Sequence, residues 1–236
     1  MNFIEVPTYR EMSERAANII MQGICDKPDF VLGLATGSTP IGTYQWLADG
    51  NRMGKVDFSS VTTVNLDEYV GLPTDNPQSY RYFMNDKLFN HINIKPENTH
   101  VPNGMAKNLA KEGERYDKLI EELGGIDLQL LGIGVDGHIG FNEPDTVFVK
   151  ATHEVVLDES TIRANSRFFK SEAEVPKTAI TMGMLSIMKA KKILLIVNGE
   201  NKKAILDKAL SGEIDPHVPA SILQLHPEVT VIYSPQ

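Results

Sequence analysis

The feature that most constrains the fold of this 236-residue chain is the alternation of short apolar runs with helical segments. Apolar runs with no exposed polar face predict buried strands at residues 30–34, 61–66, 126–131, 178–181, 192–197 and 229–233. Apolar residues at helical spacing predict helices at residues 10–23, 41–47, 108–123, 182–188 and 204–210. Strands that alternate with helices are typical of a parallel sheet. The sequence therefore predicts a single α/β domain over residues 1–236, with an open, mostly parallel, Rossmann-like sheet and helices on both faces.

The composition excludes several classes of protein. A formal net charge of −8 argues against nucleic acid or anionic lipid as the main partner. No apolar run approaches the ~18 residues of a membrane-spanning helix, and the N-terminal residues do not form a signal peptide. The single cysteine, Cys25, rules out an internal disulfide and is typical of the reducing cytoplasm. We expect a cytoplasmic protein that binds neither nucleic acid nor membrane.

The densest polar chemistry follows the predicted strand at residues 126–131. Within eight residues the chain places Asp136, His138, Asn142 and Glu143 among glycines, which let a backbone turn sharply and approach a ligand. A carboxylate beside a histidine fixes its tautomer and raises its basicity, as acid–base catalysis requires. Packing alone gives no reason for so many polar groups at the end of a strand. This stretch is the candidate active site.

Three other interpretations of this stretch are open. Its glycines at 132, 134 and 137 match the spacing of the dinucleotide-binding fingerprint, but the residues that follow show no helical period. Asp136, His138 and Glu143 are also possible metal ligands, although the chain has neither a His-Glu-x-x-His motif nor another His/Cys cluster. A loop whose polar groups only satisfy one another is the third. Acid–base chemistry without cofactor or metal is favoured over all three.

The loop after the strand at residues 30–34 has the composition of an anion-binding site. It is made of small and hydroxyl residues and precedes a predicted helix, with Thr39 expected as its N-cap and Pro40 in its first turn. Backbone N–H groups at a helix N-terminus attract anions such as phosphate. The loop lacks the Gly-Lys-Ser/Thr end of a Walker motif, and a plain tight turn is the alternative. The candidate phosphate-binding residues here are Thr36, Gly37, Ser38 and Thr39.

Two further strand ends carry charged residues. Asp67 follows the strand at 61–66 and is a candidate general base, and Lys202 follows the strand at 192–197. Arg163 and Arg167 lie four apart on one face if their mixed segment is helical, and they are candidate phosphate ligands. Because ligands of open α/β sheets bind beyond the carboxyl ends of the strands, we expect the four loops to form one site. The residues predict a phosphorylated small molecule with acid–base chemistry at its other end, and both lactone hydrolysis and proton transfer on a sugar fit that description.

Five stretches of the chain resemble one known family. They span most of the sequence and are Leu34–Pro40, Asn65–Leu72, Gly132–Pro144, Ala164–Phe169 and Leu223–Pro227. The Asp-Gly-His-Ile-x-Phe-Asn-Glu-Pro run within them is the most specific. On these motifs the chain resembles the glucosamine-6-phosphate deaminase (isomerase) family. The resemblance implies conversion of glucosamine 6-phosphate and water to fructose 6-phosphate and ammonia, without an organic cofactor.

The resemblance also implies a role for each candidate residue. Asp67 is implied to be the base that moves a proton between C1 and C2 of the sugar. His138 is implied to assist opening of the sugar ring, oriented by Asp136 and Glu143. The loop around Gly37, Ser38 and Thr39 is implied to hold the phosphate together with Arg167 and either Lys202 or Lys203, of which Lys202 is favoured. The segment near residues 153–182 resembles the family's lid, which excludes water during the reaction.

The chain departs from the long, allosterically regulated members of the family. Those members carry basic residues before the lid that bind N-acetylglucosamine 6-phosphate, where this chain has His153 and Val155. They also have a longer C-terminal tail, whereas this sequence stops at Gln236. The resemblance is therefore to the short form without this activation. It implies hyperbolic kinetics and a monomer or small homo-oligomer in preference to a hexamer.

Two rival functions are compatible with the same motifs. A 6-phosphogluconolactonase is similar in fold and shares an Asp-Gly-His element, but the residues that follow it here, 139–144, favour the deaminase. A non-catalytic sugar-phosphate-sensing domain normally accompanies a DNA-binding segment, for which the residues before Pro7 leave no room. The presence of Asp67, His138 and Glu143 together also favours turnover over binding alone.

Overall fold

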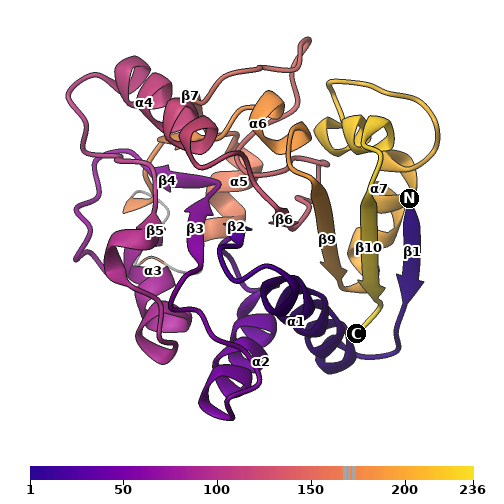
Figure 1. Cartoon of the computed structure of the whole chain (residues 1–236). Coiled ribbons are helices and arrows are strands. Elements are labelled where there is room, and N and C mark those ends of the chain that lie inside the picture. Colours follow the sequence, from indigo (N-terminus) through magenta and orange to yellow (C-terminus); the bar gives the residue numbers. More distant parts are fainter. Residues whose placement is uncertain (167–168, 170, 172–173) are drawn as a thin grey trace.

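A seven-stranded sheet forms the centre of the computed structural model, which describes residues 1–166, 169, 171 and 174–236 (Figure 1). All of its strands are parallel, in the order β1-β10-β9-β6-β2-β3-β5. The strands are β1 (Asn2–Glu5), β2 (Val31–Leu34), β3 (Thr62–Asn65), β5 (Thr99–His100), β6 (Leu128–Leu131), β9 (Lys192–Asn198) and β10 (Val229–Ser234). The predicted α/β class and parallel sheet are confirmed.

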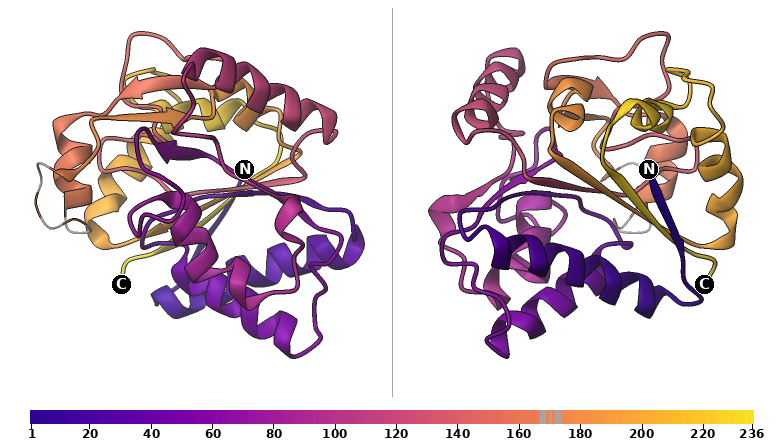
Figure 2. Two further views of the ribbon diagram at one scale, coloured as in Figure 1. Left: turned by 90° about the vertical axis from the view of Figure 1, so that its left-hand side faces the viewer. Right: turned by 45° about the vertical axis from the view of Figure 1, so that its right-hand side comes forward.

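Helices cover both faces of this sheet, as the two views of Figure 2 show. One layer contains α1 (Tyr9–Asp26), α2 (Ile41–Arg52) and α3 (Tyr80–Lys87), and the other contains α4 (Leu109–Glu122), α6 (Met184–Met188) and α7 (Lys203–Ala209). Strand β9 packs Ile193, Leu195 and Val197 toward the second layer and Leu194 and Ile196 toward the first. A strand buried on both faces needs apolar residues at every position, which is why it reads as a continuous apolar run. None of the helices in the described ranges is long and apolar enough to cross a membrane.

The order of the strands creates a switch point between β2 and β6. From β2 the chain builds β3 and β5 on one side, then returns to β6 on the other side of β2 and continues to β9 and β10. The loops that leave β2 and β6 therefore diverge from adjacent strand ends. In open α/β sheets such a crevice at the carboxyl edge is where ligands bind.

A second sheet, absent from the prediction, lies beside the first. Strand β8 (Thr178–Thr181) pairs antiparallel with both β4 (Asp67–Tyr69) and β7 (His153–Val156). Asp67 lies directly opposite Thr181 in this pairing, so the candidate base belongs to a strand of the small sheet. The short helix α5 (Glu159–Asn165) follows β7. Because β8 is the central strand and Ala179–Thr181 are buried, the proposed lid at 153–182 ends in a fixed strand.

The predicted cap of α2 is wrong by one residue. Pro40 occupies the N-cap position, the helix begins at Ile41, and no side chain caps it. The backbone angles of Pro40, φ −80° and ψ −6°, are helical, whereas a capping threonine or serine has extended angles. Thr39 precedes this cap position, and its hydroxyl does not cap the helix. Thr39 is thereby left at the end of the loop that faces the carboxyl edge.

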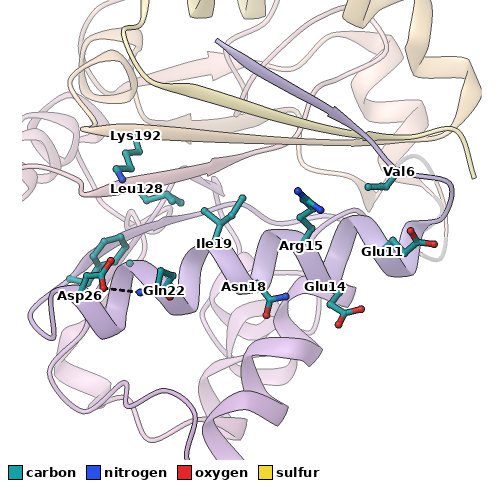
Figure 3. Close-up of a pocket in the computed structure, with 12 residues that line it drawn as sticks. Val6, Glu11, Glu14, Arg15, Asn18, Ile19, Gln22, Asp26, Leu128 and Lys192 are labelled. Atoms are coloured by element: carbon teal, nitrogen blue, oxygen red, sulfur yellow. Dashed lines mark hydrogen bonds between the residues drawn. The ribbon is translucent and has the colours of Figure 1, made fainter.

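A groove of about 630 Å³ runs along α1 under the sheet (Figure 3). Leu128 and Lys192, the first residues of β6 and β9, border one end of it. That end lies at the amino edge of the sheet, away from the switch point. Its acidic side chains and the basic Arg15 and Lys192 carry both signs of charge, so the lining indicates no single class of ligand.

Asp127, which lies just before β6, contacts Val31 at the start of β2, Lys191 just before β9 and Lys27 at the end of α1. These contacts lead to a prediction about stability. Its carboxylate, with 5% of the residue exposed, accepts hydrogen bonds from Lys27 Nζ at 2.6 Å, Lys191 Nζ at 2.7 Å and the Val31 amide at 2.8 Å. Burial alone raises the pKa of this carboxyl, but the two lysines and the amide outweigh it and lower the pKa. We expect Asp127→Asn to reduce the free energy of unfolding by about 1–3 kcal/mol at neutral pH.

The sign of the pH dependence follows from the lowered pKa. The stabilising effect of Asp127 is present above the pKa of the unfolded carboxyl and is lost as the pH falls through the lower folded value. Urea unfolding of the wild type and Asp127→Asn at neutral and acid pH measures this. A difference in stability that does not shrink toward acid pH would show that the lysine pairing is not its source.

Candidate active site

A cavity of about 430 Å³ opens at the carboxyl edge of the parallel sheet. Its lining includes residues from the loops that follow β2, β3, β6 and β9, which are the four strand ends predicted to converge. The wall also includes α5 residues. Among the lining residues are Thr36, Gly37, Ser38, Thr39, Asp67, Tyr80, Gly134, His138, Thr161, Asn165 and Lys202.

The loop after β2 presents its backbone to this cavity. Gly37 has a φ of +96°, a conformation that a residue with a Cβ rarely adopts, and a Cβ there would meet no atom within 4 Å. Two tyrosines hold the loop in place: the Tyr44 hydroxyl donates to the Ala35 carbonyl, and the Tyr9 hydroxyl donates to the Ser38 carbonyl at 3.2 Å. The arrangement of strand, bent loop and helix N-terminus is suited to an anion.

Asp67 and Glu68 are adjacent in the sequence, but their carboxylates make different contacts. Glu68 accepts hydrogen bonds from the amides of Tyr69, Tyr80 and Arg81, and so anchors the N-terminus of α3. Asp67 lines the cavity with only 6% of the residue exposed. Burial, together with the negative charge of Glu68, raises the pKa of Asp67 to about 8, against a smaller lowering effect of His138. A carboxylate of raised pKa beside a cavity has the properties of a general base.

Two carboxylates hold one nitrogen of His138. Its Nδ1 atom lies 2.7 Å from Asp136 Oδ1 and 3.4 Å from Glu143 Oε2. Burial alone lowers the pKa of the imidazole, but the carboxylates Asp136 and Glu143 outweigh it and raise the pKa to about 9. Burial raises the pKa of Asp136, yet its contacts with His138 dominate and lower the pKa to about 2. The predicted grouping of Asp136, His138 and Glu143 is present, with His138 in the cavity wall.

Backbone contacts fix the loop that carries this group. The Gly134 amide donates to the His138 carbonyl at 2.9 Å, and Gly137 adopts a φ of +92° between them. On its other side the Phe141 amide donates to Thr181 Oγ1 at 3.0 Å, and Asn142 Nδ2 donates to the Met182 carbonyl at 2.9 Å. The loop is therefore fastened to the central strand of the small sheet, which pairs with the strand that carries Asp67.

The geometry also decides between the open interpretations of this loop. Residues 132–152, all described, contain no helix, so the dinucleotide-fingerprint interpretation is wrong. Asp136, His138 and Glu143 offer ligand atoms within 4.8 Å of one another, which meets a loose criterion for a metal site. However, 2.7 Å between Nδ1 and a carboxylate oxygen is the distance of a direct ion pair, whereas two ligands at roughly 2.1 Å around a tetrahedral ion lie farther apart. The grouping fits a histidine paired with two carboxylates better than a metal.

The candidate cations fall in different places. Lys202 lines the cavity and donates to the Ile133 carbonyl at 2.8 Å, whereas Lys203 pairs with Asp207 outside the cavity wall. Arg163 is exposed on α5 and is not part of the lining. Arg167 lies outside the described residues. Of the two lysines, Lys202 is therefore the one in the cavity wall.

The residues of the wall that were not predicted as site residues include Tyr80, Thr161 and Asn165. Tyr80 faces the cavity and stacks on Phe141 with ring centroids 5.9 Å apart. Thr161 and Asn165 reach it from α5. Their four-residue spacing places both on one face of α5, a signal that the sequence carries only if this segment is taken to be helical. Tyr80 gave no such signal because it belongs to a helix absent from the prediction.

The fold and cavity define an α/β protein with a loop suited to an anion and a buried carboxylate–histidine group at its switch point. A model of the family described as glucosamine-6-phosphate isomerases/6-phosphogluconolactonase matches residues 7–232. The chain belongs to this family. The resemblance drawn from the sequence motifs is therefore confirmed.

Among individual relatives, the sequence identity is high to glucosamine-6-phosphate deaminases and low to a 6-phosphogluconolactonase. A glucosamine-6-phosphate deaminase of Lachnoclostridium phytofermentans is 62% identical over 98% of both chains, and one of Thermoanaerobacter pseudethanolicus is 56% identical over 98% of this chain and 92% of its own. The solved structure of a monomeric glucosamine-6-phosphate deaminase is 49% identical, with a TM-score of 0.97 over 99% of this chain and 97% of that one. The 6-phosphogluconolactonase of Thermotoga maritima shares only the fold, at 21% identity and a TM-score of 0.77 over 99% and 98% of the two chains.

Proposed function

We propose that this protein is a glucosamine-6-phosphate deaminase, an ammonia-releasing hydrolase that converts glucosamine 6-phosphate and water to fructose 6-phosphate and ammonia. The observation that carries the proposal is that Asp67 and His138 face the same cavity as the anion-binding loop. The high identity to proteins named as deaminases supports this choice of reaction over the lactonase, with which the chain shares only the fold.

Each group in the cavity supplies one part of the proposed chemistry. The backbone at Gly37–Thr39, with Lys202 and Arg167, holds the phosphate. His138, protonated because its pKa is about 9, presents Nε2 to the ring oxygen and assists ring opening, while Asp136 and Glu143 hold Nδ1. The exposed aldehyde makes the C2 proton acidic, Asp67 removes it, and return of a proton at C1 gives a ketimine. Water then hydrolyses this imine to the ketone and ammonia.

The experiment that tests the proposal offers the purified protein both candidate substrates. We expect ammonia and fructose 6-phosphate in equal amounts from glucosamine 6-phosphate, and no enzyme-dependent hydrolysis of 6-phosphogluconolactone. Lactone hydrolysis without ammonia would establish the rival enzyme. Tight binding of glucosamine 6-phosphate without any product would establish a sensing domain.

The two neighbouring lysines provide a matched pair of variants. We expect Lys202→Met to raise KM for glucosamine 6-phosphate about tenfold or more, because one charge-assisted contact to the phosphate is lost. Lys203→Met should leave KM unchanged, since Lys203 pairs with Asp207 outside the cavity. Steady-state kinetics of both variants measures this, and a larger effect at Lys203 would reverse the assignment.

We also expect simple regulation of the enzyme. His153 and Val155, on β7, replace the basic residues of the allosteric members, so substrate dependence should be hyperbolic. N-acetylglucosamine 6-phosphate should not lower KM, and a clear decrease in a steady-state assay would contradict this. The solved monomeric deaminase of the same fold supports a monomer or small homo-oligomer. We also expect the protein to be cytoplasmic.

A further inference from the structure

One buried hydroxyl in the cavity wall takes no part in the chemistry above. Thr161 lies in α5 with 4% of the residue exposed, and it lines the cavity. Its Oγ1 atom is buried and has no hydrogen-bond partner in the described part of the chain. A buried hydroxyl without a partner costs free energy, so an unpaired one in a residue that lines a cavity indicates a contact made when the cavity is filled.

The position of α5 decides what this contact can be. The loops after β2 and β9 bring the anion site and Lys202, and the loops after β3 and β6 bring Asp67 and His138. Helix α5 adds a further part of the wall, whose described members, Thr161 and Asn165, are uncharged and polar. The four loops thus already supply groups for the phosphate and for the reacting carbons of the substrate. An uncharged donor and acceptor is suited to a sugar hydroxyl.

We propose that Thr161 binds a hydroxyl group of the sugar between the phosphate end and the reacting carbons, and so contributes to selection of the substrate. The proposal rests on the proposed function, because it takes a sugar phosphate as the occupant of the cavity. A site that hydrogen-bonds a substrate hydroxyl discriminates strongly against an analogue that lacks it, since the protein group is then left unpaired.

The chain offers a matched control for this threonine. Thr43, in α2, is also fully buried and its Oγ1 also has no partner in the described part of the chain, but it does not line the cavity. Replacement of either threonine by valine keeps the shape and removes an unpaired hydroxyl. Both variants should therefore fold and unfold at temperatures no lower than the wild type.

The test is the steady-state kinetics of Thr161→Val, Thr161→Ser and Thr43→Val with glucosamine 6-phosphate and with its 3-deoxy and 4-deoxy analogues. We expect kcat/KM to fall roughly 5- to 100-fold in Thr161→Val, to be largely retained in Thr161→Ser and to be unchanged in Thr43→Val. For the wild type, kcat/KM with one of the two deoxy analogues should be lower than with glucosamine 6-phosphate by a similar factor. For that analogue, Thr161→Val should lower kcat/KM little further, because the hydroxyl that Thr161 binds is already missing.

The assignment would be overturned if Thr161→Val had the kcat/KM of the wild type. It would also be overturned if Thr161→Val lowered kcat/KM by the same factor for both deoxy analogues as for glucosamine 6-phosphate. A third contrary result is inhibition by inorganic phosphate weakened by that same factor, which would indicate a general disturbance of the cavity. If the wild type makes no ammonia at all, the proposed function fails separately. Calorimetric binding of glucosamine 6-phosphate and its deoxy analogues then tests Thr161 by the same ratios.

Discussion

Asp67→Asn is expected to lower kcat by about a thousandfold or more while the protein remains folded. Asparagine has the same shape as aspartate but cannot accept a proton, and general-base catalysis typically contributes 10²–10⁴-fold. Asp67 lines the cavity and burial raises its pKa to about 8, so it is ionised only at the alkaline end of the physiological range. We therefore expect wild-type kcat/KM to rise with pH up to about 8, as Asp67 ionises, and to fall again above about 9, as His138 loses its proton.

The same raised pKa predicts a gain in stability for this variant. Between the unperturbed pKa of 3.8 and the folded pKa of about 8, the folded protein retains a proton that the unfolded chain has lost. The stability of the wild type therefore falls as the pH rises through this window. The asparagine side chain carries no charge to bury, so Asp67→Asn should unfold a few degrees above the wild type at neutral pH.

Asp127→Asn is the matched control for Asp67→Asn. Both aspartates are almost fully buried, but Asp127 lies at the amino edge of the sheet and pairs with lysines. Asp127→Asn should lose stability and keep its activity at low temperature, the opposite of Asp67→Asn. Equal losses of activity in the two variants would contradict the assignment of the base, and so would a stable Asp67→Asn variant of normal activity.

Gly134→Ala is expected to have the second-largest effect, a loss of at least about 100-fold in kcat/KM. A Cβ at Gly134 would lie 2.3 Å from both Nδ1 and Cε1 of His138, far inside van der Waals contact. The ring cannot remain between Gly134 and its two carboxylates, so it must leave the position in which Asp136 and Glu143 hold it. We expect the loss to match that of His138→Gln, as measured by steady-state kinetics.

Gly50→Ala is the control for this substitution. Gly50 lies in α2, and its added Cβ would meet first the flexible end of Met21, with Sδ at 2.5 Å. Alanine is also favoured over glycine within a helix. Gly50→Ala should keep full activity. Full activity in Gly134→Ala would mean that the His138 ring position described here is not the one used in catalysis.

The sequence predicted the parallel sheet and its site edge well because the relevant signals are local. Strands β2, β6 and β9 are buried on both faces, so each appears as a mainly apolar run, interrupted in β6 by the buried Gln129, and small or polar residues follow each strand. Parallel strands end at a common edge, and this rule alone is enough to predict that Asp67, His138 and Lys202 lie together.

The small sheet and the division of labour within the site are set by contacts distant in sequence. Strand β4 is only the three residues Asp67–Tyr69, and its polar start looks like a turn until β8 pairs with it about 110 residues later. Glu68 is indistinguishable from Asp67 as a candidate base until α3 supplies the amides that it accepts. Thr161 is an ordinary helical threonine in the sequence, and only the packing of α5 shows it in the cavity.

The central claim is that Asp67, shielded from solvent, carries the proton from C2 to C1. The most direct test is to convert glucosamine 6-phosphate deuterated at C2 in ordinary water and to measure deuterium at C1 of the fructose 6-phosphate by NMR. A base with only 6% of the residue exposed exchanges its proton slowly enough for some return, so a measurable fraction of the deuterium should appear at C1. Deuterium absent from C1 at every stage of conversion would contradict transfer by one buried carboxylate.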